Sequence, residues 1–295
     1  MFRQTATSTT DLACRAVGRR QVVRAARFVL LRARLDVPND MTTNGEHALQ
    51  RCVIGLTEPG APVQVIDVGA NVGRWSAALL GAARQAGRLP DIELHAFEPS
   101  AHTYRRMSGA LAGCGVAMFQ AGLSDRVGHA TLHVAGPGAG INSLHRPDGQ
   151  AALSTEQVAV TTLDQHAREN SLDSVTLVKI DTEGHDLAVL RGARELLARQ
   201  RIAVVQFEYN HRWIYGRSFL RDAFELLEPL GYRIGKLTPR GVEFYPCWDA
   251  DLETFVEGNY IACTPRMAAR LPAVSWWKAA SPAASHGRAG SVRVS

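Results

Sequence analysis

The chain has 295 residues, of which 46% are hydrophobic, and this is enough for one large or two small domains with sizeable cores. Its formal net charge of +5 comes almost entirely from arginine, and no aromatic-rich basic motif accompanies it, so nucleic acid is not expected as a partner. The five cysteines lack the spacing of a disulfide framework or of a structural zinc site, which predicts reduced thiols and a cytoplasmic location.

Residues 1–40 are predicted to form an N-terminal extension that carries a basic amphipathic helix. Residues 1–10 are polar and expected to be mobile, whereas the pattern is helical from Leu12 to Leu35. Apolar side chains and arginines form opposite stripes of this helix: Val22, Ala26, Val29 and Ala33 against Arg20, Arg24, Arg27 and Arg34. We expect the helix to pack on the main domain through Val22, Val29 and Leu30. A helix lying on an anionic membrane surface and an Arg-rich transit peptide are the less favoured alternatives, and no apolar run reaches transmembrane length.

The main domain, residues 41–270, is organised around the stretch Gln64–Ser76, QVIDVGANVGRWS. Its β-branched start is typical of a buried parallel strand, and Trp75 and Leu79 follow two glycines at helical spacing. A strand, a glycine turn and a helix form a nucleotide-binding corner, with backbone N–H groups at the helix N-terminus. Asn71 stands where a dinucleotide fingerprint could place a glycine, and no P-loop lysine follows. An ordinary tight turn of an α/β protein is the alternative.

Strands and helices then alternate, which predicts a doubly wound, Rossmann-like α/β fold with a mostly parallel sheet. Further strands are expected at 92–97, 116–119, 175–180, 202–207, 232–237 and 260–263. Helices are expected at 46–56, from about 74, and at 101–112, 186–199 and 219–230. The stretch 122–157 is less regular, with short strands near 131–134 and 158–162 around a loop at 136–140. The segment around Phe244 is turn-rich, and residues 271–295 are expected to be a disordered tail.

Polar groups follow four of the predicted strands, and ligands of such sheets bind at the carboxyl ends of the strands. These groups are Asp67–Asn71, Glu98, Asp181–His185 and Glu208–Asn210. Glu98 lies 25 residues beyond Gly73, close to the spacing of about 20 at which an acid accepts the ribose hydroxyls of an adenosine cofactor. A solvent-facing acid at a strand end is the alternative for Glu98.

The motifs VIDVGANVG, HAFEPS and VKIDTEGHDLAVLRGA, in this order and at these intervals, resemble the FkbM family of S-adenosylmethionine-dependent methyltransferases. TTNGE, GLSD and TTLD fit the same family, and the resemblance runs from about Thr42 to Asn210, with a weaker match through Cys263. It implies a seven-stranded class I fold with a reversed final strand. It also implies S-adenosylmethionine as cofactor and O-methylation of a small-molecule or glycan acceptor, a hydroxyl of a sugar, glycolipid or polyketide.

The resemblance also assigns roles by position. It implies that the cofactor is bound by Asp67, Gly69, Ala70, Asn71, Gly73, Glu98, Ser124 and Asp125. In this assignment the glycine loop lines the methionine part, Asp67 orders that loop, and Glu98 takes the ribose. The adenine contact is Ser124, Asp125 or backbone alone. A nicotinamide-dependent oxidoreductase, disfavoured by Asn71, and a non-catalytic nucleotide- or sugar-binding module are the alternative functions.

Methyl transfer to a hydroxyl needs a base that takes the hydroxyl proton. Asp181, Glu183 and His185 are the catalytic candidates, and His185 has a suitable unperturbed pKa of about 6.5. A helix-start role for His185 and a helix-capping role for Glu183 are the alternatives. Glu208 is a further candidate at the next strand end. These carboxylates could bind Mg²⁺, but none of them shows metal-ligand spacing, so no metal is predicted.

Overall fold

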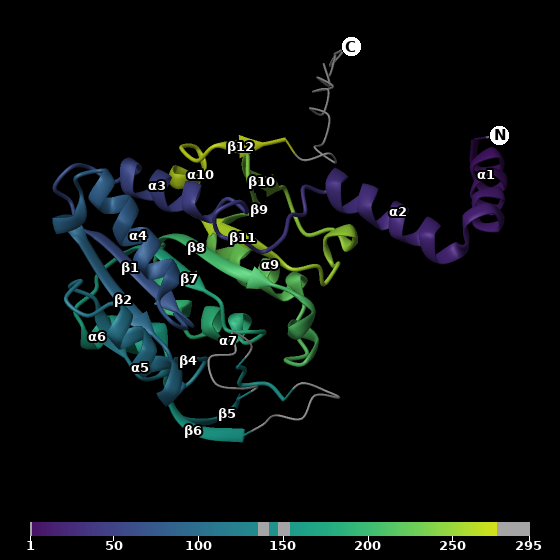
Figure 1. The fold of residues 1–295 in the computed structure, drawn as a ribbon. Helices are drawn as coiled ribbons and strands as arrows, with labels where there is room; N and C mark the ends of the chain where they lie inside the picture. The colour runs from purple at the N-terminus through teal and green to yellow at the C-terminus, as the bar shows by residue number, and fades with distance from the viewer. Residues whose placement is uncertain (1, 135–141, 147–153, 276–295) are drawn as a thin grey trace, which may run out of the picture.

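The structure, a computed structural model, describes residues 2–134, 142–146 and 154–275. Nine strands of these ranges form one central sheet (Figure 1). From one edge to the other they are β12 (Ala273–Val274), β10 (Gly241–Tyr245), β9 (Arg233–Thr238), β11 (Gly258–Cys263), β8 (Ile202–Tyr209), β7 (Val175–Ile180), β1 (Val63–Val68), β2 (Ile92–Phe97) and β3 (Ala117–Phe119). The predicted loop at 136–140 and most of the predicted tail lie outside the described residues.

Seven of the strands form the predicted core of the sheet. β3, β2, β1, β7 and β8 pair in parallel, and β11 runs antiparallel to both β8 and β9. This confirms a mostly parallel sheet with a reversed final strand. β10 and β12 add two strands beyond β9, whereas the sequence indicated only turns around Phe244, where β10 lies, and a disordered tail from residue 271, where β12 lies. The tail expectation is wrong at Ala273 and Val274, because these residues pair in parallel with β10. The turn-rich expectation was wrong because Thr238 and Gly241 close a tight hairpin that pairs β10 with β9.

Helices cover both faces of the sheet, which confirms the doubly wound arrangement. One face packs against α3 (Glu46–Leu56), α4 (Arg74–Gln85), α5 (Ala101–Ala110) and α10 (Pro265–Ala268). The other packs against α6 (Leu163–Glu169), α7 (Asp186–Arg191), α8 (Arg194–Ala198) and α9 (Leu220–Leu227). Single turns of 3₁₀ helix occur at η1 (Leu89–Asp91), η2 (His211–Ile214), η3 (Glu228–Leu230) and η4 (Ala250–Leu252).

The predicted helix at 186–199 is divided into α7 and α8 at Gly192. A Cβ atom at Gly192 would lie 2.0 Å from the carbonyl oxygen of Ser124, so this backbone passes too close for any larger residue. This close approach holds the end of α7 against Ser124, in the segment that follows β3.

A second, smaller sheet lies beside the first, with the order β4 (Gly122–Leu123), β6 (Ser154–Thr161) and β5 (Gly128–Val134). It has a small core of its own, made by Leu132, Val134, Val158 and Val160. The sequence indicated short strands in this stretch but not that they form a separate sheet. In Figure 1 this sheet lies below β2 and α5, on the side where the strands of the central sheet end.

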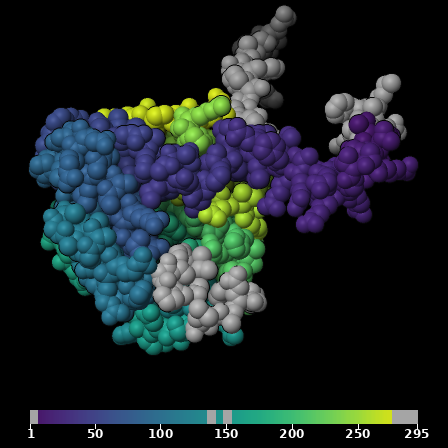
Figure 2. Space-filling view, in the orientation of Figure 1, coloured from purple at the N-terminus to yellow at the C-terminus, as the bar shows by residue number. Residues whose placement is uncertain are grey.

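The N-terminal extension consists of two helices, α1 (Phe2–Val17) and α2 (Arg19–Ala33), that break at Gly18 with φ 87°. They stand out from the rounded body of the molecule (Figures 1 and 2). No residue of α2 is buried, so the expected packing through Val22, Val29 and Leu30 is wrong. The residues expected to be mobile instead form most of α1. Neither helix, nor any other in the described ranges, is long and apolar enough to cross a bilayer.

The chain meets the main domain only after α2 has ended. Arg34 Nη1 donates a hydrogen bond to the carbonyl of Asp251 at 2.6 Å, and Asp36 pairs with Lys236 of β9. These polar contacts position the connecting segment along the sheet.

Candidate active site

The glycine corner between β1 and α4 brings two strand ends into contact. Gly69 has φ 75°, and a Cβ there would lie 2.0 Å from the carbonyl oxygen of Asp181, which follows β7. Only glycine therefore allows the ends of β1 and β7 to approach in this way. Asn71 adopts φ 51°, a conformation that asparagine tolerates better than most residues. Gly73, with φ 81°, is the N-cap of α4 and packs against Leu111.

A buried lysine ties these two strand ends together. Lys179 Nζ lies 3.3 Å from Asp67 Oδ1 and 3.3 Å from Asp181 Oδ2, and it donates to the carbonyl of Gly69 at 3.4 Å. Burial acts to lower the pKa of Lys179, but the charges of Asp67 and Asp181 outweigh it and hold the pKa above its ordinary value. Asp67 also accepts from Ser76 Oγ at 2.7 Å. These ion pairs and hydrogen bonds hold the glycine corner in place.

Sequence reasoning gave Lys179 no role of its own. The sequence did contain a signal for it, because Lys179 lies within a strand predicted to be buried, and a buried ammonium group requires a partner. Asp67, expected to order the glycine loop, is fully buried and lies behind the corner.

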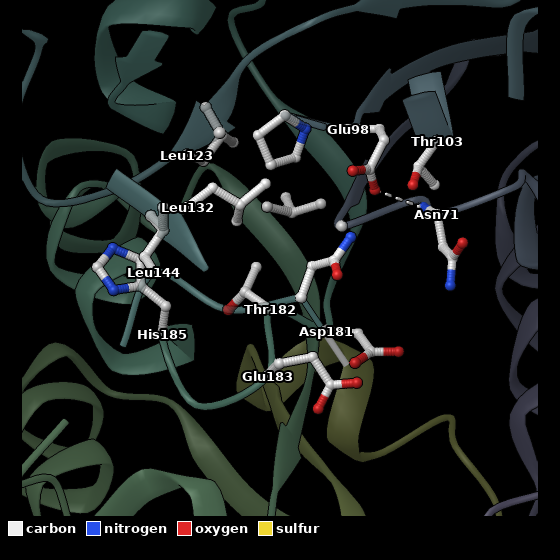
Figure 3. Close-up of a pocket in the computed structure, with 15 residues that line it drawn as sticks. Asn71, Glu98, Thr103, Leu123, Leu132, Leu144, Asp181, Thr182, Glu183 and His185 are labelled. Carbon is white, nitrogen blue, oxygen red and sulfur yellow. Dashed lines mark hydrogen bonds between the residues drawn. The ribbon is translucent and has the colours of Figure 1, made fainter. Parts of the chain in front are cut away.

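A cavity that is partly open to solvent lies at the carboxyl ends of β1, β2 and β7 (Figure 3). It brings together six of the predicted site residues: Gly69, Asn71, Glu98, Asp181, Glu183 and His185. Glu98 and Asn71 lie on one side of it, and Asp181, Glu183 and His185 on the other. Its apolar wall, which the sequence did not identify, is formed by Pro99, Leu123, Leu132 and Leu144. Part of this wall comes from the second sheet.

A second cavity adjoins the first, and both are lined by Gly69, Asn71 and Asp181. Its remaining lining residues include the predicted Ala70 together with Met41, Arg74, Arg106 and Lys179. The glycine corner is thus a ridge with one cavity on either side.

Glu98 already holds backbone groups on both of its oxygens. Its Oε2 accepts from the N–H of Asn71 at 3.1 Å, and its Oε1 accepts from the N–H of Ser100 at 2.9 Å. Burial raises the pKa of Glu98 to about 7, and these two N–H groups oppose the rise. The carboxylate therefore joins the glycine corner to the first turn of α5.

The chemistry of the residues that line the first cavity suits an adenosine cofactor. Thr103 is 2% exposed and lines it, yet among the described residues its Oγ1 has no hydrogen-bond partner. A buried hydroxyl without a partner costs free energy that a bound polar ligand can recover. Glu98 stands beside Thr103 in Figure 3, and the leucine wall across the cavity can cover a flat aromatic base.

Ser124 and Asp125 do not line either cavity. Ser124 instead contacts His185, and its Oγ lies 2.9 Å from His185 Nε2. The other ring nitrogen of His185 lies 3.2 Å from His145 Nε2. Burial, and next the neighbouring His145, lower the pKa of His185 to about 4. A neutral ring with both nitrogens occupied is poorly suited to take a proton from substrate at neutral pH.

Carboxylates dominate the opposite side of the first cavity. Glu183 has φ 57° and its Oε2 lies 2.6 Å from Arg212 Nη1. Burial and the charge of Asp181 raise the pKa of Glu183 to about 8, against the opposing charge of Arg212. Glu208, at the end of β8, accepts from Asn39 Nδ2 at 2.7 Å, and burial raises its pKa as well. Within the described ranges, no group of three or more His, Cys, Asp or Glu side chains is arranged to hold a metal ion.

Comparisons with known proteins agree with this architecture. The model of the Methyltransferase FkbM domain matches residues 67–234, more than half of the chain. The 2-O-methyltransferase NoeI of Sinorhizobium fredii (strain NBRC 101917 / NGR234) is 27% identical over 217 residues, which are 66% of this chain and 82% of that protein.

Solved structures with a related fold are more distant. Precorrin-6y C5,15-methyltransferase of Geobacter metallireducens GS-15 has a TM-score of 0.36 at 12% identity, over 74% of this chain and 87% of that chain. Fibrillarin of Aeropyrum pernix, solved with S-adenosyl-L-methionine, has a TM-score of 0.37 at 12% identity, over 73% of each chain.

The family match, together with the seven-stranded core and its glycine corner, defines a class I methyltransferase whose methyl donor is S-adenosylmethionine. Within that class the chain belongs to the FkbM methyltransferase family. The nicotinamide-dependent alternative is thereby overturned.

Proposed function

We propose that this methyltransferase acts on a hydroxyl oxygen of a sugar, a glycolipid or polysaccharide, or a polyketide-type metabolite. The observation that carries the proposal is the pair of carboxylates, Asp181 and Glu183, that faces Glu98 across one cavity. A hydroxyl must lose its proton as it is methylated, and a carboxylate next to the reacting oxygen can accept it. The O-methyltransferase activity named for NoeI supports the same reaction.

We further propose that the cofactor is held on the Glu98 side of the cavity. In this arrangement Gly69, Ala70 and Asn71 contact the methionine part, Glu98 accepts from the ribose, and Thr103 supplies its free hydroxyl. When bound, S-adenosylmethionine supplies an electrophilic methyl group, whose bond to sulfur breaks as the bond to the acceptor oxygen forms. Asp67 and Gly73 act indirectly by fixing the loop. Ser124 acts through His185, and Asp125 has no direct contact with the cavity.

Glu183 is the proposed proton acceptor. Arg212 holds one oxygen of its carboxylate, which leaves the other for the acceptor hydroxyl. A pKa of about 8 makes the ionised form a stronger base than an ordinary carboxylate, and its population rises with pH. His185, first considered for this role, is proposed to position the chain after β7 through Ser124 and His145.

The test is methyl transfer from labelled S-adenosylmethionine to panels of sugars, glycolipids and polyketides, with product stability in mild alkali as the readout. Methyl ethers survive this treatment, whereas methyl esters of carboxylates are hydrolysed. We expect alkali-stable product from the wild type. Glu183→Gln should lower turnover about 10²–10⁴-fold while S-adenosylhomocysteine affinity stays unchanged.

Exposed Glu58 provides the matched control, and Glu58→Gln should retain activity. Turnover should rise with pH through about 8 in the wild type and lose this rise in Glu183→Gln. Near wild-type turnover in Glu183→Gln, Asp181→Asn and His185→Ala alike would place the catalytic centre elsewhere, and Glu208 would be tested next.

A further inference from the structure

The helix α2 presents a large apolar surface that the described part of the molecule does not cover. Val23, Val29 and Leu30 lie on one side of the helix and are 57–64% exposed, Phe28 on the arginine side is 66% exposed, and none of the residues of α2 is buried. Figure 2 shows the N-terminal helices projecting from the body of the molecule. Leaving four large apolar side chains in water on one short helix is unfavourable, so such a surface indicates an interaction site.

The same helix is strongly basic. Its sequence RRQVVRAARFVLLRA contains five arginines and no acidic residue. Val22, Ala26 and Val29 recur at helical spacing on one side, and Arg20, Arg24 and Arg27 lie on the opposite side. The partner must therefore offer negative charge and an apolar layer along the same 15-residue helix.

We propose that α2 binds the surface of an anionic lipid membrane and lies in the plane of the headgroups. In this position the valines and Leu30 enter the boundary of the acyl chains, and the arginines contact lipid phosphates through extended side chains. The membrane alternative, disfavoured when the helix was expected to pack on the domain, becomes the better interpretation because that packing does not occur.

Two other partners fit the helix less well. A second copy of α2 would bring five further positive charges to the contact, with no acid on either helix to compensate them. A nucleic acid would neutralise the arginines but leave Val23, Val29 and Leu30 in water. Of these three partners, the lipid surface is the one that satisfies the charge and the apolar residues together.

The position of α2 in the chain gives this binding a consequence for the enzyme. After α2 ends at Ala33, Asn39 donates to Glu208 near the end of β8, and Met41 lines the second cavity. Only five residues lie between Ala33 and Asn39. A membrane-bound α2 would thus hold the cavities close to the lipid surface, where a lipid-linked acceptor is found. This last step rests on the proposed function, whereas lipid binding itself does not.

The experiment is cosedimentation of the full chain with vesicles. Vesicles of phosphatidylcholine mixed with phosphatidylglycerol are compared with vesicles of phosphatidylcholine alone. We expect binding to the anionic vesicles that weakens with salt. Each arginine contributes about fivefold to partitioning, so Arg20→Glu, Arg24→Glu and Arg27→Glu together should reduce it at least about 100-fold.

Two further variants separate charge from apolar contact. Val23→Ser, Val29→Ser and Leu30→Ser together should also release the protein, with no change in net charge. The matched control replaces three exposed arginines of the main domain by glutamate (Arg194, Arg199 and Arg201) and should retain binding.

S-adenosylhomocysteine affinity should be the same in all variants, which shows that the main domain is folded. The proposal would be overturned if both α2 variants still bound the vesicles, or if the wild type bound vesicles with and without phosphatidylglycerol equally well. A dimer that the same α2 substitutions dissociate, or RNA binding in the absence of vesicle binding, would also overturn it. A wild-type protein that binds anionic vesicles but transfers no methyl group to any acceptor would instead contradict the proposed function alone.

Discussion

Among single residues, Glu98 combines a structural and a binding role in one carboxylate. It accepts from the N–H of Asn71 and the N–H of Ser100, and it lines the cavity proposed for the cofactor. Replacing it with alanine would remove these backbone contacts together with those to the ribose. Glutamine keeps the shape and one acceptor oxygen, so it separates the two roles better.

We predict that Glu98→Gln weakens S-adenosylhomocysteine binding at least tenfold, because charge-assisted hydrogen bonds contribute roughly 1.5–3 kcal/mol each. The pKa of about 7 adds a pH dependence. The ionised form has more acceptor sites for ribose hydroxyls, so wild-type affinity should rise from pH 6 to pH 8. Isothermal titration calorimetry across this range is the measurement. An equally steep rise in Glu98→Gln would show that another group is responsible.

At the scale of elements, the meeting of β1 and β7 depends on the glycine that separates them. We predict that Gly69→Ala destabilises the protein by more than about 3 kcal/mol or abolishes cofactor binding, because the new Cβ would overlap the Asp181 carbonyl at a positive φ. Gly81, inside α4 with open space around it, is the matched control. Gly81→Ala should stabilise by roughly 0.5–1 kcal/mol in denaturant unfolding. If Gly69→Ala folds and binds normally, the close approach is not required.

The elements that sequence reasoning located correctly are those with strong local signals. The strand β1, its glycine turn and α4 follow from β-branched residues, two glycines and helical spacing, and Glu98 follows from its distance along the chain. The parallel strands β7 and β8 are likewise rich in β-branched and other apolar residues. These features depend on residues that are close in sequence or at a fixed interval.

The features that were missed depend on contacts between distant segments. Leu132 and Leu144 line the cavity only because the second sheet lies against the strand ends. The pKa of His185 falls because burial and His145, 40 residues away, act on it. For α2, an amphipathic pattern shows that an apolar side exists, but it does not identify what covers that side.

At the scale of the whole molecule, several buried carboxyl groups make stability depend on pH. The pKa values of Glu98 and Asp186 are raised to about 7 and that of Glu183 to about 8, in each case chiefly by burial. Between pH 6.5 and pH 8 the unfolded chain has already lost these protons, whereas the folded protein still binds part of them. The free energy of unfolding therefore falls as pH rises through this window. The buried histidines oppose this fall only at the lower end of the window, where they are neutral in the folded protein because their pKa values are lowered, while the unfolded chain still releases histidine protons as pH rises above about 6.5.

We predict that Asp186→Asn reduces this fall by about 1 kcal/mol. Asp186 is fully buried, its Oδ2 accepts from Thr182 Oγ1, and its Oδ1 lacks a partner among the described residues, so an amide fits the site. Urea unfolding of the cofactor-free protein at pH 6.5 and pH 8 measures the effect. An unchanged difference between the two pH values would mean that Asp186 titrates normally in the folded state.

The order of the central sheet has a consequence for how copies of the protein can meet. The described sheet ends in β3, with three residues, at one edge and in β12, with two, at the other. An extended segment of another chain would find few free backbone N–H and C=O groups at either end. Edge-to-edge strand addition, the usual first step toward amyloid-like aggregates of β-rich proteins, therefore has little template in the central sheet. The longer described edge is β5, with seven residues, in the second sheet, so we expect the central sheet to resist this form of aggregation.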